Sequence, residues 1–419
     1  MFSKSKLDGS IITSLLDADF YKFTMGQWVC KFHADRSVRY GFRNRTKGIR
    51  LLDEIGLWEL RVQMEYARTL RFSKSELHYL RGTNEYRDRM FDEEYLGFLA
   101  AYQLPAYELQ EIDGGFTLEF AGTWLEQIHW ETIALSIINE ARSRRKLREM
   151  SWFERDCLEA EGKRRLAQKI AILKKHPEIT FTDFGTRRRF SFDWQDYVVE
   201  ALKSELSPTQ FLGTSNTLLA AKHGLLPMGT SAHEMFMVIA AMFGRTEEGL
   251  LAATDLVLKE WWDLYGQGLS IALTDTFGSD YFFRTIKAER AERWKGVRQD
   301  SGDPFEFAEK AIAFYEGLGI NPKEKLIVFS DGLNIETIVE LHEHFHGRIK
   351  VTFGWGTNLT NDLGGFEPLS LVIKILSADG YPAVKLSDNL AKALGDPEEV
   401  ERYKRVFGYT TTFNQGVTY

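Results

Sequence analysis

The turn at residues 297–304 reads VRQDSGDP and combines a guanidinium group with two carboxylates. Arg298 can grip a carboxylate or phosphate through two parallel hydrogen bonds, and Asp300 and Asp303 can hold Mg²⁺ or sugar hydroxyls. Asp303 followed by Pro304 also suits a helix start, with the aspartate as N-cap and the proline at the first helical position. That interpretation does not explain Arg298 and Asp300, because charges at the end of a strand are costly unless they are paired.

A histidine follows a Gly-Thr turn in the stretch LPMGTSAHEMFM, at residues 226–237. If Thr230 or Ser231 caps the next helix, His233 lies in its first turn, where the helix dipole disfavours imidazolium. The ring would then be neutral and nucleophilic near pH 7. Glu234 is its neighbour in sequence, but adjacent side chains diverge on a helix. Position alone favours a structural role for His233 over a catalytic one.

Two other turns could bind anions. The turn TDFGTRRRF places three consecutive arginines, 187–189, after a strand, and cations at a helix start oppose the helix dipole unless an anion is bound there. We expect one or two of these arginines to point inward. The turn TFGWGTN offers backbone N–H groups at Gly354 and Gly356 and the hydroxyl of Thr357, which suit a phosphate. The alternative is a tight turn with both glycines at positive φ.

Single acids occupy two more turns of the same kind. LTDTFGSD contains Asp275, and VFSDGLN contains Asp331, each directly after an apolar run. Either residue can be an N-cap or a turn residue, and either can hold a metal ion or a ribose hydroxyl. The sequence leaves open which aspartate of the chain would contact a metal directly.

Composition excludes several classes of protein. The chain has 419 residues, 44% of them apolar and 27% charged, which is typical of globular proteins and long enough for two domains. No apolar tract is long enough to span a membrane, and the first residues lack the features of a signal peptide. A net charge of −7 gives no general attraction to nucleic acid, so an anionic ligand would need local arginines. Two distant cysteines fit a reducing cytoplasm.

The turns imply the elements that must position them. From about residue 179, an apolar run, a polar turn and an amphipathic segment recur seven times, which is typical of parallel strands with helical crossovers. The pattern predicts a β/α barrel over residues 146–368, in which the turns after the strands share one face. Residues 1–145 are predicted to form a mixed domain, with strands at 38–45 and 115–122 and helices at 51–70, 92–102 and 123–150. The hairpin at 370–389 predicts that residues 369–419 return to that domain.

Read in order, the motifs resemble one family. LLDADFYKFTMGQ, DFGTRRRFS, GTSN, PMGTSAHE, ALTDTF, GVRQDSGDP, VFSDGLN and FGWGTNLTND follow one another as they do in the bacterial nicotinate phosphoribosyltransferases, over residues 14–390. The resemblance implies the fold of the type II phosphoribosyltransferases, an irregular seven-stranded α/β barrel beside an α/β N-terminal domain. It also implies synthesis of nicotinate mononucleotide and diphosphate from nicotinate and 5-phosphoribosyl 1-diphosphate. ATP and Mg²⁺ are the co-substrate and cation implied, and the product feeds NAD synthesis.

The resemblance also implies roles for individual residues. His233 corresponds to the family's phosphohistidine, which reverses the order suggested by its position alone, and Arg298 and Asp300 join it as catalytic residues. The residues implied to contact nicotinate are Tyr21, Phe184, Arg187, Thr230 and Arg298. The residues implied to contact the phosphoribosyl donor are Asp275, Asp300, Asp303, Asp331, Gly354, Gly356 and Thr357. A homodimer is implied, with Tyr21 reaching the site of the neighbouring subunit.

One position separates nicotinate from nicotinamide as the substrate. The nicotinamide-using relatives carry an aspartate where this chain has Ser215. An aspartate accepts a hydrogen bond from a carboxamide but repels a carboxylate, so serine favours nicotinate. Three alternatives remain: a nicotinamide-using enzyme of the same fold, a quinolinate phosphoribosyltransferase, and a non-catalytic barrel that senses nucleotides. The quinolinate enzyme needs no ATP, and the GTSAHE motif disfavours it.

Overall fold

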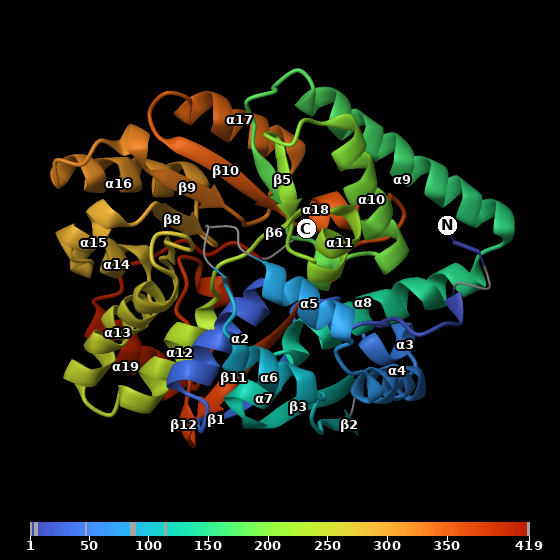
Figure 1. Cartoon of the computed structure of the whole chain (residues 1–419), viewed down its shortest axis with the longest axis horizontal. Coiled ribbons are helices and arrows are strands. Elements are labelled where there is room, and N and C mark those ends of the chain that lie inside the picture. The colour runs from blue at the N-terminus through green and yellow to red at the C-terminus, as the bar shows by residue number, and fades with distance from the viewer. Residues whose placement is uncertain (1, 4–6, 47, 84–88, 113–114, 417–419) are drawn as a thin grey trace.

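The computed structural model describes residues 2–3, 7–46, 48–83, 89–112 and 115–416. It contains a five-stranded sheet and a seven-stranded sheet, each with helices packed against it. Figure 1 shows the smaller sheet below and the larger, curled sheet above, with the long helix α8 near their junction. The predicted combination of a mixed N-terminal domain and a parallel α/β unit is confirmed.

The smaller sheet is antiparallel and joins the two ends of the chain. Its strands, in the order β12-β11-β1-β3-β2, are Tyr381–Pro382, Leu371–Ala378, Ser37–Asn44, Gly115–Thr123 and Glu108–Ile112. β1 lies between β3 and β11, so the late segment pairs with an early strand in the interior of the sheet. The strands expected at 38–45 and 115–122 are therefore present. The tight turn between β11 and β12 contains Asp379 at positive φ, a conformation that aspartate tolerates better than most residues.

Helices cover this sheet and separate it from the larger one. They are α2 (Tyr21–Phe32), α3 (Leu51–Glu54), α4 (Leu57–Thr69), α5 (Lys74–Gly82), α6 (Glu93–Ala101), α7 (Trp124–Gln127) and α8 (Trp130–Glu149). The single helix expected at 123–150 is thus two helices, with Ile128 and His129 between them. α8 is buried along most of its length because it contacts β11 on one side and the Thr186–Arg188 turn, η1, on the other.

The larger sheet contains the seven predicted parallel strands. They are β4 (Phe181–Asp183), β5 (Phe211–Thr214), β6 (Leu226–Pro227), β7 (Ile271–Leu273), β8 (Gly296–Gln299), β9 (Leu326–Phe329) and β10 (Lys350–Trp355). Their order is β6-β5-β4-β10-β9-β8-β7, and no pairing joins β6 to β7 among the strands that the structure describes. The sheet is therefore a half-barrel rather than a closed one. Two helices, α12 (His233–Phe243) and α13 (Glu247–Tyr265), intervene in the chain at this open side.

The other helices that connect the parallel strands after β4 are α10 (Phe192–Glu205), α11 (Thr217–His223), α14 (Ser279–Thr285), α15 (Ala288–Arg293), α16 (Pro304–Gly317) and α17 (Ile335–Phe345), with the 3₁₀ turn η2 (Pro322–Glu324). Figure 1 shows α16 and α17 at the outer edge of the sheet. α9 (Trp152–Leu173) precedes β4, whereas α18 (Thr357–Thr360), the 3₁₀ turn η3 (Leu390–Lys392) and α19 (Pro397–Phe407) follow β10. Among the described residues, no helix is long and apolar enough to cross a membrane.

Candidate active site

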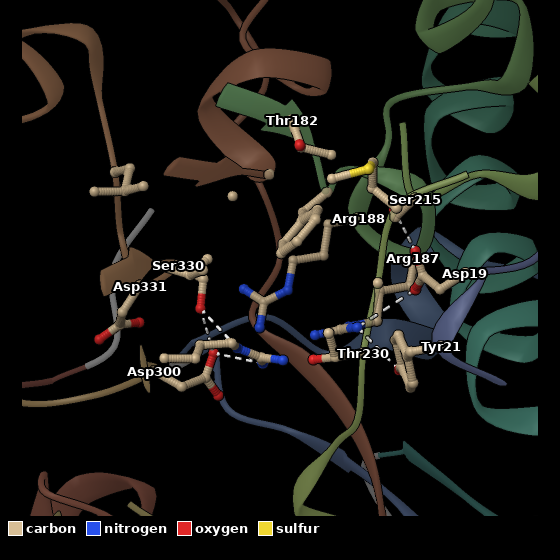
Figure 2. A pocket seen from close by; sticks show the side chains of 18 of the residues that line it. Asp19, Tyr21, Thr182, Arg187, Arg188, Ser215, Thr230, Asp300, Ser330 and Asp331 are labelled. Carbon is tan, nitrogen blue, oxygen red and sulfur yellow. Dashed lines mark hydrogen bonds and ion pairs between the residues drawn. The ribbon is translucent and has the colours of Figure 1, made fainter. Parts of the chain in front are cut away.

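The turns after the parallel strands meet in one cavity of about 290 Å³. Its wall comes from the half-barrel, the start of α2, α8 and the returning strand β11. The predicted site residues that line it are Tyr21, Phe184, Arg187, Thr230, His233, Arg298, Asp300, Asp331, Gly354, Gly356 and Thr357. Figure 2 shows an acidic group around Asp300 and Asp331 on one side and a group around Arg187 and Tyr21 on the other. Parallel strands thus bring together side chains that are far apart in sequence.

His233 is the first residue of α12 and is almost fully buried. Its Nε2 lies 2.8 Å from Asp300 Oδ2, and its Nδ1 lies 2.9 Å from Thr276 Oγ1. Burial, and then the nearby charge of Lys385, lower the pKa of His233 to about 4, so the ring is neutral at pH 7. The expected cap is wrong: Ala232 is the N-cap, and neither Thr230 nor Ser231 caps the helix.

The neighbouring Glu234 faces away from the cavity, as expected for adjacent residues on a helix. Its Oε1 accepts hydrogen bonds of 3.0 Å from Tyr40 Oη and Trp124 Nε1, and its Oε2 pairs with Lys22. His233 is therefore oriented by Asp300 and Thr276, from the β8 and β7 turns, rather than by its own helix.

Arg298 and Asp300 form a bonded unit beside this histidine. The guanidinium donates to Asp300 Oδ1 at 3.0 Å, to the Ser231 carbonyl at 3.0 Å and to Ser330 Oγ at 3.1 Å. The positive charge of Arg298 and the hydrogen bond with His233 hold the pKa of Asp300 well below its usual range, despite its burial. Asp300 is thus a carboxylate anion that connects Arg298 to the ring of His233.

Asp275 and Asp303 do not line the cavity, although both were predicted site residues. Asp303 caps α16, because its side chain accepts hydrogen bonds of 2.9 Å from the backbone N–H groups of Phe305 and Glu306. Asp275 is buried directly behind His233, with Oδ1 at 3.8 Å from Nε2. The alternative helix-start interpretation of Asp303 is therefore correct, and Asp275 lies behind the cavity wall rather than in it.

The carboxylates behind His233 fit a hard divalent cation. One atom each of His233, Asp275 and Asp300 lies within 4.8 Å of the others. Asp275 Oδ1 is buried and has no hydrogen-bond partner among the described residues, which is costly unless a cation uses it. Mg²⁺ prefers carboxylate oxygens and retains several waters, so two aspartates are a sufficient protein contribution.

On the opposite side of the cavity, Arg187 lies between a phenol and a carboxylate. Its Nη1 is 3.1 Å from Tyr21 Oη and 3.4 Å from Asp19 Oδ2. Ser215 Oγ donates to Asp19 Oδ1 at 2.6 Å (Figure 2). Burial raises the pKa of Asp19, while the charge of Arg187 opposes that shift.

Tyr21 lines the cavity of its own chain, which differs from the expectation that it reaches a neighbouring subunit. The physical reason is the anchoring of α2: Phe20 N donates to the Ser215 carbonyl at 2.7 Å, and Asp19 forms a β-bridge with Asn216. These contacts hold the start of α2 over the β5 turn of the same chain. Tyr21 thus lines the cavity of its own chain, and the homodimer stays a prediction.

The three consecutive arginines divide as expected between inward and structural roles. Arg187 and Arg188 line the cavity, whereas Arg189 is fully buried and pairs with both oxygens of Asp17. Because Arg189 is buried away from the cavity, Arg187 and Arg188 are the two of the three that can reach an anionic ligand there.

The glycines of the β10 turn do not have positive φ, so that alternative is wrong. A Cβ atom at Gly354 would lie 2.3 Å from the ring of Phe184, and one at Gly356 would lie 3.2 Å from the Phe184 carbonyl. These glycines allow the β4 turn to pack closely against the β10 turn, which places the ring of Phe184 at the cavity wall.

Comparisons with known proteins cover both domains. The model of the nicotinate phosphoribosyltransferase N-terminal domain matches residues 16–139, and the model of the nicotinate phosphoribosyltransferase family matches residues 179–411. The chain belongs to the nicotinate phosphoribosyltransferase family. The crystal structure of the Vibrio cholerae nicotinate phosphoribosyltransferase is 36% identical with a TM-score of 0.85, over 96% of this chain and 95% of that one. The enzyme from Porphyromonas gingivalis is 31% identical with a TM-score of 0.84, over 95% and 100%.

In this member of the nicotinate phosphoribosyltransferase family, five basic residues of the cavity were missed by sequence reasoning. They are Arg45, Lys295, Lys374, Lys385 and Lys392. Burial lowers the pKa of Lys385 to about 8, and Lys392 Nζ contacts the Asp300 carbonyl at 3.1 Å and the Asp331 carboxylate. The sequence contains a signal for Lys374, because this lysine lies between two isoleucines in an otherwise mostly apolar strand. A lysine in such a strand requires a partner or a ligand.

Proposed function

We propose that this chain joins nicotinate to 5-phosphoribosyl 1-diphosphate, forming nicotinate mononucleotide and diphosphate, and that ATP drives the reaction through a phosphohistidine at His233. The observation that carries the proposal is the neutral, buried His233 held between Asp300 and Thr276 in the same cavity as Arg187 and Tyr21. The two free cysteines support a reducing compartment, and we assign the reaction to the cytoplasm.

The side of the cavity that contains Arg187 suits an anionic aromatic ring. Phe184 and Tyr21 offer ring faces, and Arg187 offers a guanidinium that can pair with the nicotinate carboxylate. Arg298 and Thr230 line the cavity between this group and His233 and would complete the nicotinate contacts. Ser215 donates its proton to Asp19, so it adds no second negative charge next to the carboxylate. This arrangement favours nicotinate over nicotinamide.

The basic residues of the opposite wall suit the phosphates of the donor. Arg188, Lys385 and Lys392 line the cavity near Asp300 and Asp331, where departing diphosphate needs positive charge. The β10 turn, with Gly354, Gly356 and Thr357, would receive the 5-phosphate. Asp275 and Asp300 would hold Mg²⁺, which supplies further positive charge to the diphosphate when bound.

The phosphorylation step uses the neutral ring of His233. Because Asp300 is an anion, Nε2–H of the neutral ring donates to it at 2.8 Å, and Nδ1 accepts a hydrogen bond from Thr276 Oγ1 at 2.9 Å. As Asp300 takes the Nε2 proton, the electron pair of Nε2 forms a bond to the γ-phosphorus of ATP, the bond from that phosphorus to the bridging oxygen breaks, and ADP leaves with the electron pair. The phosphorylated ring is then neutral, with Nδ1 still held by Thr276 and the proton on Asp300. Hydrolysis of the N–P bond then regenerates the histidine.

Product formation tests this proposal directly. Purified chain is incubated with 5-phosphoribosyl 1-diphosphate, MgCl₂ and either nicotinate, nicotinamide or quinolinate, with and without ATP, and the nucleotides are separated by chromatography. We expect nicotinate mononucleotide to form, with a higher kcat/KM when ATP is present. Mononucleotide from nicotinamide at an equal kcat/KM would refute the proposed specificity, and retained ligand binding without any product would indicate a sensor.

A further inference from the structure

Asp275 is held by a chain of serine hydroxyls that no predicted role accounts for. Ser301 Oγ donates to Asp275 Oδ2, and Ser387 Oγ donates to Ser301 Oγ at 2.8 Å. The backbone N–H of Asp388 donates to the same Ser301 oxygen at 2.9 Å. The side chains of Asp275, Ser301 and Ser387 are almost completely buried. The chain therefore runs from the C-terminal segment, through the β8 turn, to the carboxylate behind His233.

The hydrogen bonds at Ser301 determine where its hydroxyl proton points. A serine hydroxyl has one proton and two lone pairs. Ser387 Oγ and Asp388 N occupy the two lone pairs, so the single proton is directed to Asp275 Oδ2. This contact fixes the rotation of the carboxylate and turns Oδ1, which has no partner among the described residues, toward His233 Nε2 at 3.8 Å.

Ser387 is itself held in an unusual backbone conformation. Its φ is +70°, in the left-handed region that residues other than glycine and asparagine rarely adopt. Its neighbour Leu386 donates from N to the Thr276 carbonyl at 2.8 Å, and Tyr409 Oη donates to the Ser387 carbonyl at 2.6 Å. The surrounding contacts therefore impose this conformation, and it places the Ser387 hydroxyl on Ser301.

We propose that Ser301 and Ser387 are positioning residues that hold Asp275 with Oδ1 free for the divalent cation shared with Asp300. This inference rests on the proposed function for the identity of the cation as Mg²⁺. Hydrogen-bond partners of a ligating carboxylate orient it, and their loss typically weakens metal affinity by about 10- to 100-fold. The Ser387 hydroxyl bonds to Ser301 Oγ at 2.8 Å and reaches Asp275 Oδ2 only at 3.5 Å, so it should contribute less than Ser301.

The test measures Mn²⁺ binding by electron paramagnetic resonance, with and without inorganic diphosphate, on the wild-type chain and three variants. Ser301→Ala removes the direct contact, and Ser387→Ala removes the one behind it. Ser270→Ala is the matched control, because its hydroxyl is equally buried but bonds to the Gln267 carbonyl at 2.7 Å instead of to Asp275. Circular dichroism and thermal melts establish that each variant is folded.

We expect Ser301→Ala to raise the dissociation constant of Mn²⁺ about tenfold or more, Ser387→Ala to raise it less, and Ser270→Ala to leave it within about twofold. If Ser301→Ala binds Mn²⁺ as the wild type does, or if the control weakens binding equally, the positioning role is wrong. Should Ser301→Ala fail to fold, an unchanged constant in Ser387→Ala would refute the chain of hydroxyls. Absence of nicotinate mononucleotide formation by the wild type would instead refute the proposed function, and the Mn²⁺ measurements are independent of it.

Discussion

Arg298→Lys keeps the positive charge of the β8 turn but removes the planar group that makes three contacts. The guanidinium bonds to Asp300 Oδ1, to the Ser231 carbonyl and to Ser330 Oγ, at 3.0, 3.0 and 3.1 Å. A single ammonium nitrogen cannot occupy three positions set by a planar fork, so we expect two contacts to be lost. At about 1 kcal/mol for a neutral contact and up to about 2 kcal/mol for one to a carboxylate, the loss is about 2 to 3 kcal/mol. This corresponds to roughly 30- to 160-fold in kcat/KM.

The contacts also determine which steps should respond. Arg298 bonds to Asp300, which holds His233, and to Ser231, which lies two residues before His233. The variant should therefore slow phosphorylation of the protein by ATP as well as weaken nicotinate binding. Single-turnover labelling with γ-labelled ATP measures the first effect, and steady-state assays with varied nicotinate measure the second. Arg284→Lys is the control, since Arg284 donates to the Phe407 carbonyl at 2.7 Å outside the cavity. A folded Arg298→Lys variant with labelling and kcat/KM within about threefold of wild type would refute the reasoning.

Two further predictions follow from the same geometry. Ser215→Asp places a second carboxylate next to Asp19, which Ser215 Oγ contacts at 2.6 Å in the wild type. The ratio of kcat/KM for nicotinate to kcat/KM for nicotinamide should therefore fall by at least about tenfold. Competition assays with both substrates measure this ratio. An unchanged ratio would remove Ser215 from the specificity argument. Because the pKa of Lys385 is lowered to about 8, its positive charge is present below that pH and lost above it, so the KM for 5-phosphoribosyl 1-diphosphate should rise as pH increases from 7 to 9. Lys385→Arg stays charged over this range, and a rise of equal size in that variant would contradict the assignment.

The repeating pattern of the sequence was sufficient to predict the larger sheet. Each predicted unit of strand, turn and helix corresponds to one observed parallel strand, because short apolar runs followed by polar turns are a local signal. The N-cap role of Asp303 was also predictable, since an aspartate followed by proline determines a helix start within a few residues. The open side between β6 and β7 was not, because closure of a barrel depends on pairing between strands distant in sequence.

The neighbours of the site residues could not be predicted in the same way. The distance from His233 to Asp300 and Thr276 depends on how α12 packs against the β7 and β8 turns, and no local pattern encodes it. The cap of α12 was predicted wrongly because Thr230 and Ser231 have the side chains of good N-caps, yet the N-cap is Ala232 and the helix begins at His233. Lys374, Lys385 and Lys392 come from the C-terminal segment, which reaches the site through pairing of β11 with β1 and through contacts with the β7 and β8 turns.

Phosphorylation of His233 is the central claim, and labelling of the protein by γ-labelled ATP tests it most directly. The wild-type chain should acquire label that is stable in base and lost in acid, as expected for a phosphoramidate, and the label should disappear in His233→Asn. Thermal melts of the variant establish that it is folded. Label that persists in folded His233→Asn, or a wild-type chain that forms nicotinate mononucleotide with ATP but never acquires label, would contradict the account.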